Sequence, residues 1–142
     1  MRRYFEFALV VTLLAILATV LLLALDDVRR DMEEAGVQAE AAAIRAQLLE
    51  RVAHREAFGG PLPASENPLD WVDSRPGNYV GELAGAPRDG GVWYFDKNDK
   101  TLVYRFHDGH SARFRLSREA GAAGGRGVIG GVGLLRLADK FE

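Results

Sequence analysis

Histidine is the first residue type in this chain to consider for catalysis or metal binding. The chain has three histidines, and two of them lie close together. His107 and His110 flank Asp108-Gly109, a pair that is typical of a tight turn. A metal ion bound there would need a third and a fourth ligand held on fixed elements. We therefore expect a solvated turn at these histidines rather than a metal site.

Other polar groups suit structural roles better than catalytic ones. Asp96, Asn98 and Asp99 carry oxygen ligands of the kind that calcium prefers, but their spacing fits no defined calcium loop and suits a hairpin turn. Ser65 and Ser111 have no evident base, and the chain contains no cysteine. We therefore expect no enzymatic activity, no cofactor and no metal.

Four arginines of the second half form a further candidate surface, and they are Arg105, Arg113, Arg115 and Arg118. If they share the outward face of a sheet, they could contact DNA or an acidic partner. The formal net charge is only −2, and acids balance bases from residue 57 onward, which argues against nucleic acid as the main partner. We expect a solvated sheet face here.

One acid, Glu6, lies at the entrance of a long apolar run. Residues 7–25 contain no charged side chain, and as a helix they would extend roughly 28 Å, close to the thickness of a bilayer core. A carboxylate at the centre of a membrane helix costs ~2.5–3.5 kcal/mol, so an acid beside such a run calls for a partner cation. Residues 1–25 are predicted to be a transmembrane helix.

Charges on either side of the run predict its orientation. Arg2 and Arg3 precede it, whereas Asp26, Asp27 and Asp31 accompany two arginines after it. Because positive charge is retained on the cytoplasmic side, we expect a single-pass protein of the inner membrane with a cytoplasmic N-terminus and a periplasmic C-terminal domain. A cleaved signal peptide is the weaker alternative, since the run is too long and no small-residue cleavage site follows it.

Residues 26–57 contain no proline and are predicted to continue the same helix as its soluble half. At helical spacing, one stripe is aliphatic and consists of Val37, Ala41, Ile44, Leu48 and Val52. An opposite stripe of small residues includes Ala35, Ala39, Ala42 and Ala46. The aliphatic stripe should pack on the chain's own domain. The alanines either admit a second helix or simply favour helix formation on a solvated face.

Residues 58–142 are predicted to form a loop and a small antiparallel sheet, which packs with residues 26–57 as one domain. The helix must end at Gly59-Gly60-Pro61, because glycine supplies a terminating conformation and proline forbids continuation. Four runs rich in β-favouring residues follow, at 92–96, 102–107, 112–117 and 132–137. We expect a three-stranded meander and a final strand, with residues 121–131 as a mobile loop. The fold class is therefore α+β.

The N-terminal pattern resembles the type IV pilins and the pseudopilins of type II secretion. Counted from Arg2, Glu6 is the fifth residue, and the apolar run follows it from Phe7 without a gap, as in that family. Two segments, Val92-Trp93-Tyr94-Phe95-Asp96 and Leu102-Val103-Tyr104-Arg105, also resemble the hairpin of pilin-like proteins. The resemblance implies a pilin-like fold, in which a long helix packs on the sheet.

The resemblance also implies a function, which is assembly into a type IV pilus or a secretion pseudopilus after extraction from the membrane. In the family, the fifth-residue glutamate pairs with the N-terminal amine of a neighbouring subunit, which assigns assembly roles to Glu6, Arg2 and Phe7. Helix packing would involve Leu13, Ile16 and Leu17 together with the alanine stripe. The alternatives are a pair between Glu6 and Arg2 or Arg3 within one helix, and a bitopic protein that does not assemble and binds a periplasmic partner.

This sequence departs from the family at several positions. Met1 stands where the family's leader ends in glycine, so prepilin peptidase is an expected partner only if a leader exists. Arg2 replaces the usual first phenylalanine of the mature chain. Leu23 and Ala15 replace a proline and a glycine, so local melting of the helix is less expected.

Overall fold

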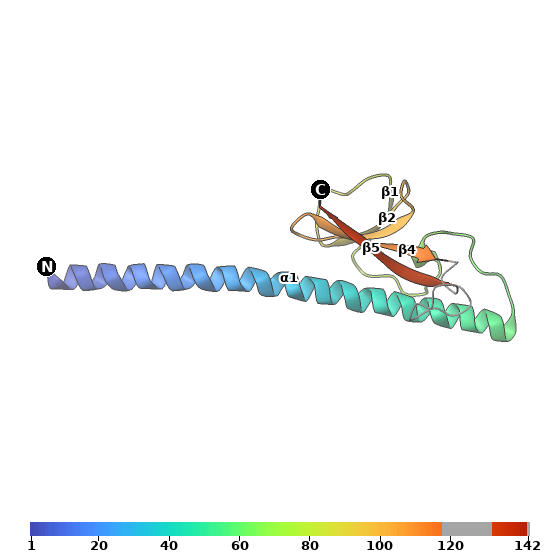
Figure 1. Ribbon diagram of the computed structural model, residues 1–142, viewed down its shortest axis with the longest axis horizontal. Helices are drawn as coiled ribbons and strands as arrows, with labels where there is room; N and C mark the ends of the chain where they lie inside the picture. Colours follow the sequence, from blue (N-terminus) through green and yellow to red (C-terminus); the bar gives the residue numbers. More distant parts are fainter. Residues whose placement is uncertain (118–131, 142) are drawn as a thin grey trace. The chain divides into compact units, whose positions relative to one another are not determined.

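The computed structural model describes residues 1–117 and 132–141. Two parts of the predictions, the loop at residues 121–131 and the side chain of Arg118, lie outside the described residues. The chain divides into two compact units, Met1–Gly36 and Val37–Glu142. One helix, α1 (Arg2–Phe58), contributes to both, and each unit is described by itself below (Figure 1).

Helix α1 forms without interruption because its 57 residues contain no proline and consist largely of strong helix formers. Gly36 is its only glycine, and its position has open space around it. The helix ends where Gly59 and Gly60 adopt φ angles of 74° and 113°, a backbone conformation that favours glycine. The amide of Gly59 donates a hydrogen bond to the Arg55 carbonyl at 2.7 Å, which closes the last turn.

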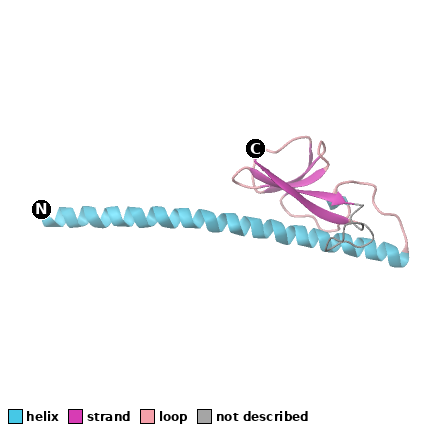
Figure 2. Cartoon of the chain, viewed as in Figure 1, coloured by secondary structure: helices cyan, strands magenta, loops and turns pink. Residues whose placement is uncertain are grey.

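In the second unit, the C-terminal part of α1 packs on a β-sheet (Figure 2). The buried residues of α1 are those of the predicted aliphatic stripe, Val37, Ala41, Ile44, Leu48 and Val52, which confirms that prediction. They share one hydrophobic cluster with side chains of the sheet and of the preceding loop, among them Trp71, Trp93 and Phe114. The sequence therefore specifies an amphipathic helix whose apolar face is satisfied within its own domain.

The sheet has five strands in the order β1-β2-β3-β4-β5. Their bounds are β1 Tyr79–Leu83, β2 Val92–Asp96, β3 Thr101–Arg105, β4 His110–Ser117 and β5 Gly133–Phe141. Strands β2, β3, β4 and β5 pair antiparallel with one another in chain order, so the predicted meander and its final strand are confirmed. The α+β class, with a long helix packed on a sheet, is thus established.

The expectation of a purely antiparallel sheet is wrong at one edge. Strand β1, which was not predicted, pairs parallel with β2. Its five residues are interrupted by Gly81, whose φ is 112°, and the register shifts between Tyr79 and Glu82. A short strand with a central glycine carries too little alternation and too few β-favouring residues to stand out in the sequence.

Aromatic rings fill the space between α1 and the sheet. The ring centroid of Trp93 lies 5.2 Å from that of Tyr104 and 5.7 Å from that of Phe114. The indole N–H of Trp93, which is fully buried, donates a hydrogen bond to the Glu40 carboxylate on α1. Aromatic packing and this polar contact fix the helix and the sheet to each other within the second unit.

Candidate functional site: the N-terminal apolar helix

The first unit consists of the N-terminal part of α1, and its apolar side chains are exposed. Every residue from 1 to 32 is exposed, including Leu9, Leu14 and Leu21 at 59–69%. Among the described residues, α1 is the one helix that is long and apolar enough to cross a membrane, and its most apolar window has no buried residue. In water this surface would be costly, since burial of apolar area contributes about 25 cal/mol per Å².

Glu6 lies near the start of this unit and is exposed. Within residues 1–117 and 132–141, it takes part in no ion pair, and neither Arg2 nor Arg3 does. The alternative of an intrahelical pair therefore finds no support in the geometry. Phe7, predicted beside Glu6 as an assembly residue, is 71% exposed. Glu6 is thus a charged group that precedes an apolar helical segment and forms no ion pair within the described chain.

Residues predicted to pack against a neighbouring helix are accessible for such a contact. Leu13, Ile16 and Leu17 are each more than half exposed. Beside them, Thr12 and Thr19 donate their hydroxyl groups to the carbonyls of Ala8 and Ala15, both at 2.8 Å. Threonine satisfies its hydroxyl in this way in an apolar setting, so neither side chain disrupts the apolar character of the helix.

An open groove on the same helix is lined by small and aliphatic residues, namely Thr12, Ala15, Ile16, Thr19 and Val20. Small residues at roughly one-turn spacing permit close approach of a second helix in a membrane. Further along α1, the predicted alanine stripe of Ala35, Ala39, Ala42 and Ala46 is exposed. The structure therefore leaves both predicted packing surfaces uncovered by the described residues, without indicating what lies against them.

Neither models of protein families, nor curated proteins, nor solved structures give a match to this chain. The family resemblance noted from the sequence thus remains a resemblance.

The turns that could have held a metal have structural explanations. The Asp96 carboxylate accepts hydrogen bonds from the amides of Asn98 and Asp99 at 2.8 and 3.3 Å, which is the geometry of an Asx turn. His110 contacts the Asp108 carboxylate and stacks on Phe106, with ring centroids 3.9 Å apart. In the described part of the chain, no group of three or more His, Cys, Asp or Glu side chains is placed to hold a metal ion.

The predicted basic surface is only partly solvated. Arg105, Arg113 and Arg115 share one face of the sheet, as expected from their alternation. Arg113 differs from a solvated side chain, because it is 16% exposed, lies 3.6 Å from the Asp99 carboxylate and donates to the Ala138 carbonyl at 3.4 Å. The prediction of a fully solvated face is therefore wrong at Arg113, which the neighbouring turn and β5 cover.

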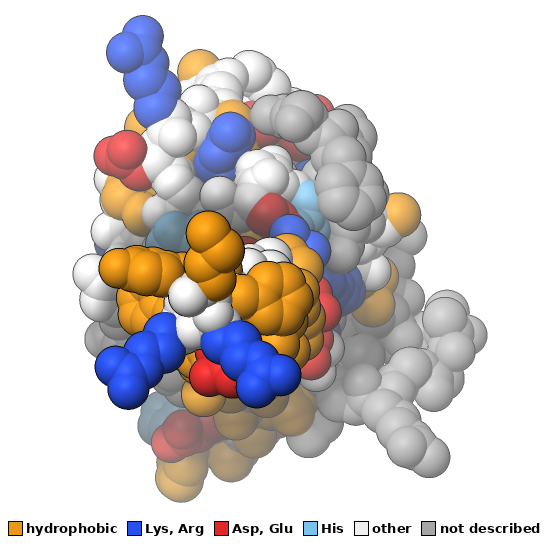
Figure 3. Space-filling model, turned by 90° about the vertical axis from the view of Figure 1, so that its left-hand side faces the viewer, with side chains coloured by type: hydrophobic (Ala, Val, Ile, Leu, Met, Phe, Trp, Pro, Cys, Tyr) orange, Lys and Arg blue, Asp and Glu red, His pale blue; other side chains and the backbone are white. Residues whose placement is uncertain are grey.

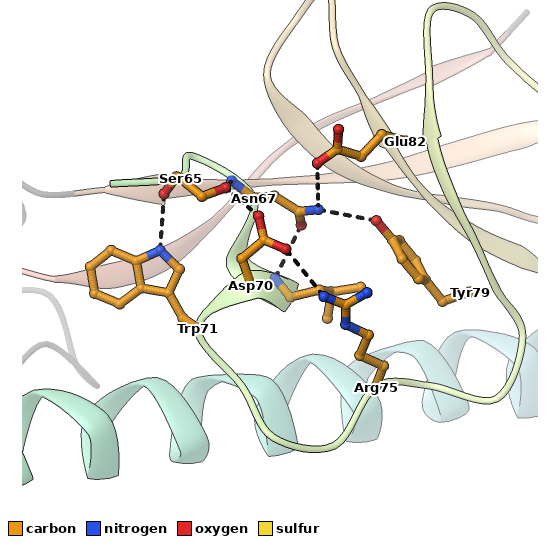
Figure 4. Close-up of polar contacts among 8 residues, drawn as sticks. Ser65, Asn67, Asp70, Trp71, Arg75, Tyr79 and Glu82 are labelled. Atoms are coloured by element: carbon orange, nitrogen blue, oxygen red, sulfur yellow. Dashed lines mark hydrogen bonds and ion pairs between the residues drawn. The ribbon is translucent and has the colours of Figure 1, made fainter. Parts of the chain in front are cut away.

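A polar cluster that the sequence did not predict links the loop after α1 to strand β1 (Figure 4). Asn67, which is 1% exposed, donates its amide to the Tyr79 hydroxyl at 3.0 Å and to the Glu82 carboxylate at 3.4 Å. Its carbonyl oxygen caps the short 3₁₀ helix Pro68–Asp70 by accepting from the Leu69 amide. Burial raises the pKa of Tyr79, and the hydrogen bond from Asn67 opposes that shift in part.

The same cluster continues on its outer side. Ser65 donates to one oxygen of the Asp70 carboxylate at 2.5 Å, and Arg75 contacts the other at 3.2 Å. The indole of Trp71 donates to the Ser65 carbonyl at 2.9 Å. Figure 4 shows the Ser65 and Arg75 side chains both directed at the Asp70 carboxylate. The residues of this cluster therefore hydrogen-bond to one another, and Asn67 joins the cluster to β1. We call this arrangement the clamp at Asn67, because it holds β1 at the sheet edge.

Proposed function

We propose that this chain is a pilin-like structural subunit of the inner membrane that assembles through its apolar N-terminal helix into a type IV pilus or a type II secretion pseudopilus. Its N-terminus lies in the cytoplasm and its second unit in the periplasm before assembly. The observation that carries the proposal is Glu6, an acid with no ion pair in the described chain, at the head of an apolar segment of α1 whose residues are all exposed.

Two physical arguments support the proposal. A helix that is apolar on every side is stable in lipid or among other helices, so the exposed segment suits both a membrane and a filament core. A carboxylate carried into either setting is stabilised by an opposite charge, because its desolvation otherwise costs several kcal/mol. A neighbouring copy can supply such a charge through its N-terminal region, which contains Arg2 and Arg3.

The absence of cysteine makes a crosslinking test straightforward, because a single introduced cysteine reacts alone. With Leu17→Cys as the probe, we expect crosslinked dimers and higher species in membranes of cells that express the full assembly machinery. Adding Glu6→Val should reduce these products at least tenfold, which corresponds to the loss of about 1.4 kcal/mol from the helix contact. Products would be measured by immunoblot after a membrane-permeable bis-maleimide treatment.

A matched probe at Asp73, whose side chain is 95% exposed on the second unit, serves as the control for random collisions. Asp73→Cys should give far fewer products than Leu17→Cys, and Glu6→Val should not change them. Equal crosslinking of Leu17→Cys with and without Glu6 would contradict the proposed role of Glu6 in subunit contacts. That outcome would leave the alternative of a bitopic protein whose helix serves only as an anchor.

A further inference from the structure

The two ends of the apolar segment differ in their charged neighbours. At its exit, Arg29 lies 3.9 Å from the Asp26 carboxylate, and three aspartates accompany two arginines. At its entrance, Arg2 and Arg3 are exposed and take part in no ion pair within the described ranges 1–117 and 132–141. The entrance therefore presents two free guanidinium groups, and the exit presents a mixture of opposite charges.

Side chains at the entrance are also sorted by type around the helix axis. At about 100° per residue, Arg2, Glu6 and Arg3 fall within one arc of roughly 100°, with Glu6 between the arginines. The rest of the circumference carries aromatic side chains, which are Tyr4, Phe5 and Phe7 at 71–82% exposure. Figure 3, which looks onto this end of the helix, shows basic side chains and an acidic one gathered on one side and hydrophobic side chains around the remainder.

This arrangement fits the boundary between lipid headgroups and hydrocarbon. Aromatic side chains favour that boundary, and arginines at the end of a membrane helix extend toward the headgroups. A guanidinium group matches a phosphate group in both charge and hydrogen-bond geometry. Basic residues beside an anionic membrane surface are attracted by about 1 kcal/mol each.

We propose that Arg2 and Arg3 form a binding site for the phosphate of an anionic phospholipid headgroup, with the aromatic side chains holding this end of the helix at the interface. Glu6, lying between the two arginines, weakens the site by repulsion. This inference rests on the membrane anchorage in the proposed function and not on filament assembly. It assigns Glu6 opposite effects in the two processes, since the acid favours subunit contacts and opposes the anionic lipid.

The test titrates the full-length protein, held as a monomer in neutral detergent micelles, with phosphatidylglycerol or with phosphatidylcholine. Bound lipid is counted by mass spectrometry of the intact complex. We expect tighter binding of phosphatidylglycerol and a preference that falls as salt is added. Arg2→Gln and Arg3→Gln should each weaken phosphatidylglycerol binding about fivefold, the equivalent of about 1 kcal/mol per basic residue.

Glu6→Gln gives the sharpest comparison, because it should tighten phosphatidylglycerol binding about fivefold by the same electrostatic argument. The matched control, Arg29→Gln, removes a paired arginine at the exit and should change this binding less than twofold. Equal binding of the two lipids, or equal losses at Arg3→Gln and Arg29→Gln, would overturn the proposal. Because the assay uses monomers, its failure would leave the crosslinking result unaffected, and a failure of crosslinking would leave this site intact.

Discussion

Residues 2–36 and residues 37–58 belong to the same helix, yet they use their apolar side chains differently. In the first segment the apolar residues lie on all sides of the axis and are exposed. In the second, five apolar residues recur every three or four positions and are buried in the hydrophobic cluster of the second unit. Polar and small residues occupy most of the remaining positions of that second segment.

The difference shows that one continuous helix can have two kinds of apolar surface, each of which requires different surroundings. A single apolar stripe requires a partner on one side, and the sheet provides it within the same domain. An apolar surface on every side cannot be covered by one sheet, and it is stable only where lipid or several helices surround it. The pattern of apolar residues around the axis therefore distinguishes the domain segment from the proposed membrane segment more sharply than helix propensity does.

The largest expected effect is on the free energy of unfolding, which should depend on the apolar residues of the second segment and not on those of the first. Leu48→Ala removes a fully buried side chain from the core and should lower the free energy of unfolding of the second unit by about 2–5 kcal/mol. Both tryptophans lie in this unit, so their fluorescence during urea unfolding in detergent micelles measures it directly. Leu17→Ala makes the same chemical change in the exposed segment and should leave the unfolding midpoint unchanged. A comparable loss of unfolding free energy in both variants would contradict the distinction between a buried and an exposed segment of the helix.

The converse prediction concerns membrane association. Leu14→Lys places a charge in the middle of the apolar run and should weaken membrane insertion by about 3 kcal/mol. The measurement is the fraction of protein that remains in the membrane pellet after alkaline carbonate extraction. Ala42→Lys adds the same charge on the exposed face of the second segment and should leave that fraction unchanged. If Ala42→Lys released the protein as readily as Leu14→Lys, the result would contradict the assignment of the N-terminal apolar segment as the membrane span.

Much of this division is predictable from the sequence because it depends on local patterns. An uninterrupted helix follows from the absence of proline, and the buried stripe follows from the spacing of Val37, Ile44 and Leu48. Strand β2 was predicted with its observed bounds, because three consecutive aromatic residues lie between two turn-forming segments there. These features need no knowledge of which segments meet in space.

What the sequence could not predict depends on contacts between segments. Strand β1 is short, contains Gly81 and takes its stability from pairing with β2. The clamp at Asn67 joins two segments twelve residues apart, and an isolated Asn-Pro pair indicates only a turn. Arg113 looks solvated by alternation, but it is covered by Asp99 and Ala138, which come from a turn and from another strand. Glu6 stands out by its type and register, whereas the partner proposed for it would come from a second molecule.

The smallest expected effect compares two tyrosines, one in each unit. Tyr79 accepts a hydrogen bond from the buried Asn67, whereas Tyr4 is 82% exposed. Tyr79→Phe should lower the free energy of unfolding of the second unit by about 1 kcal/mol at neutral pH, the usual net contribution of one hydrogen bond. Tyr4→Phe should not change it.

The pH dependence of the same pair follows from the raised pKa of Tyr79 in the folded protein. A raised pKa means that folding favours the neutral phenol, so this contribution is complete below the unfolded pKa of about 10 and is lost as pH rises through the folded value. Wild type should therefore lose stability faster than Tyr79→Phe as the pH rises above about 10, so that the two urea midpoints converge. Midpoints that stay parallel across this range would show that Tyr79 keeps an ordinary pKa and that its hydrogen bond alone stabilises β1.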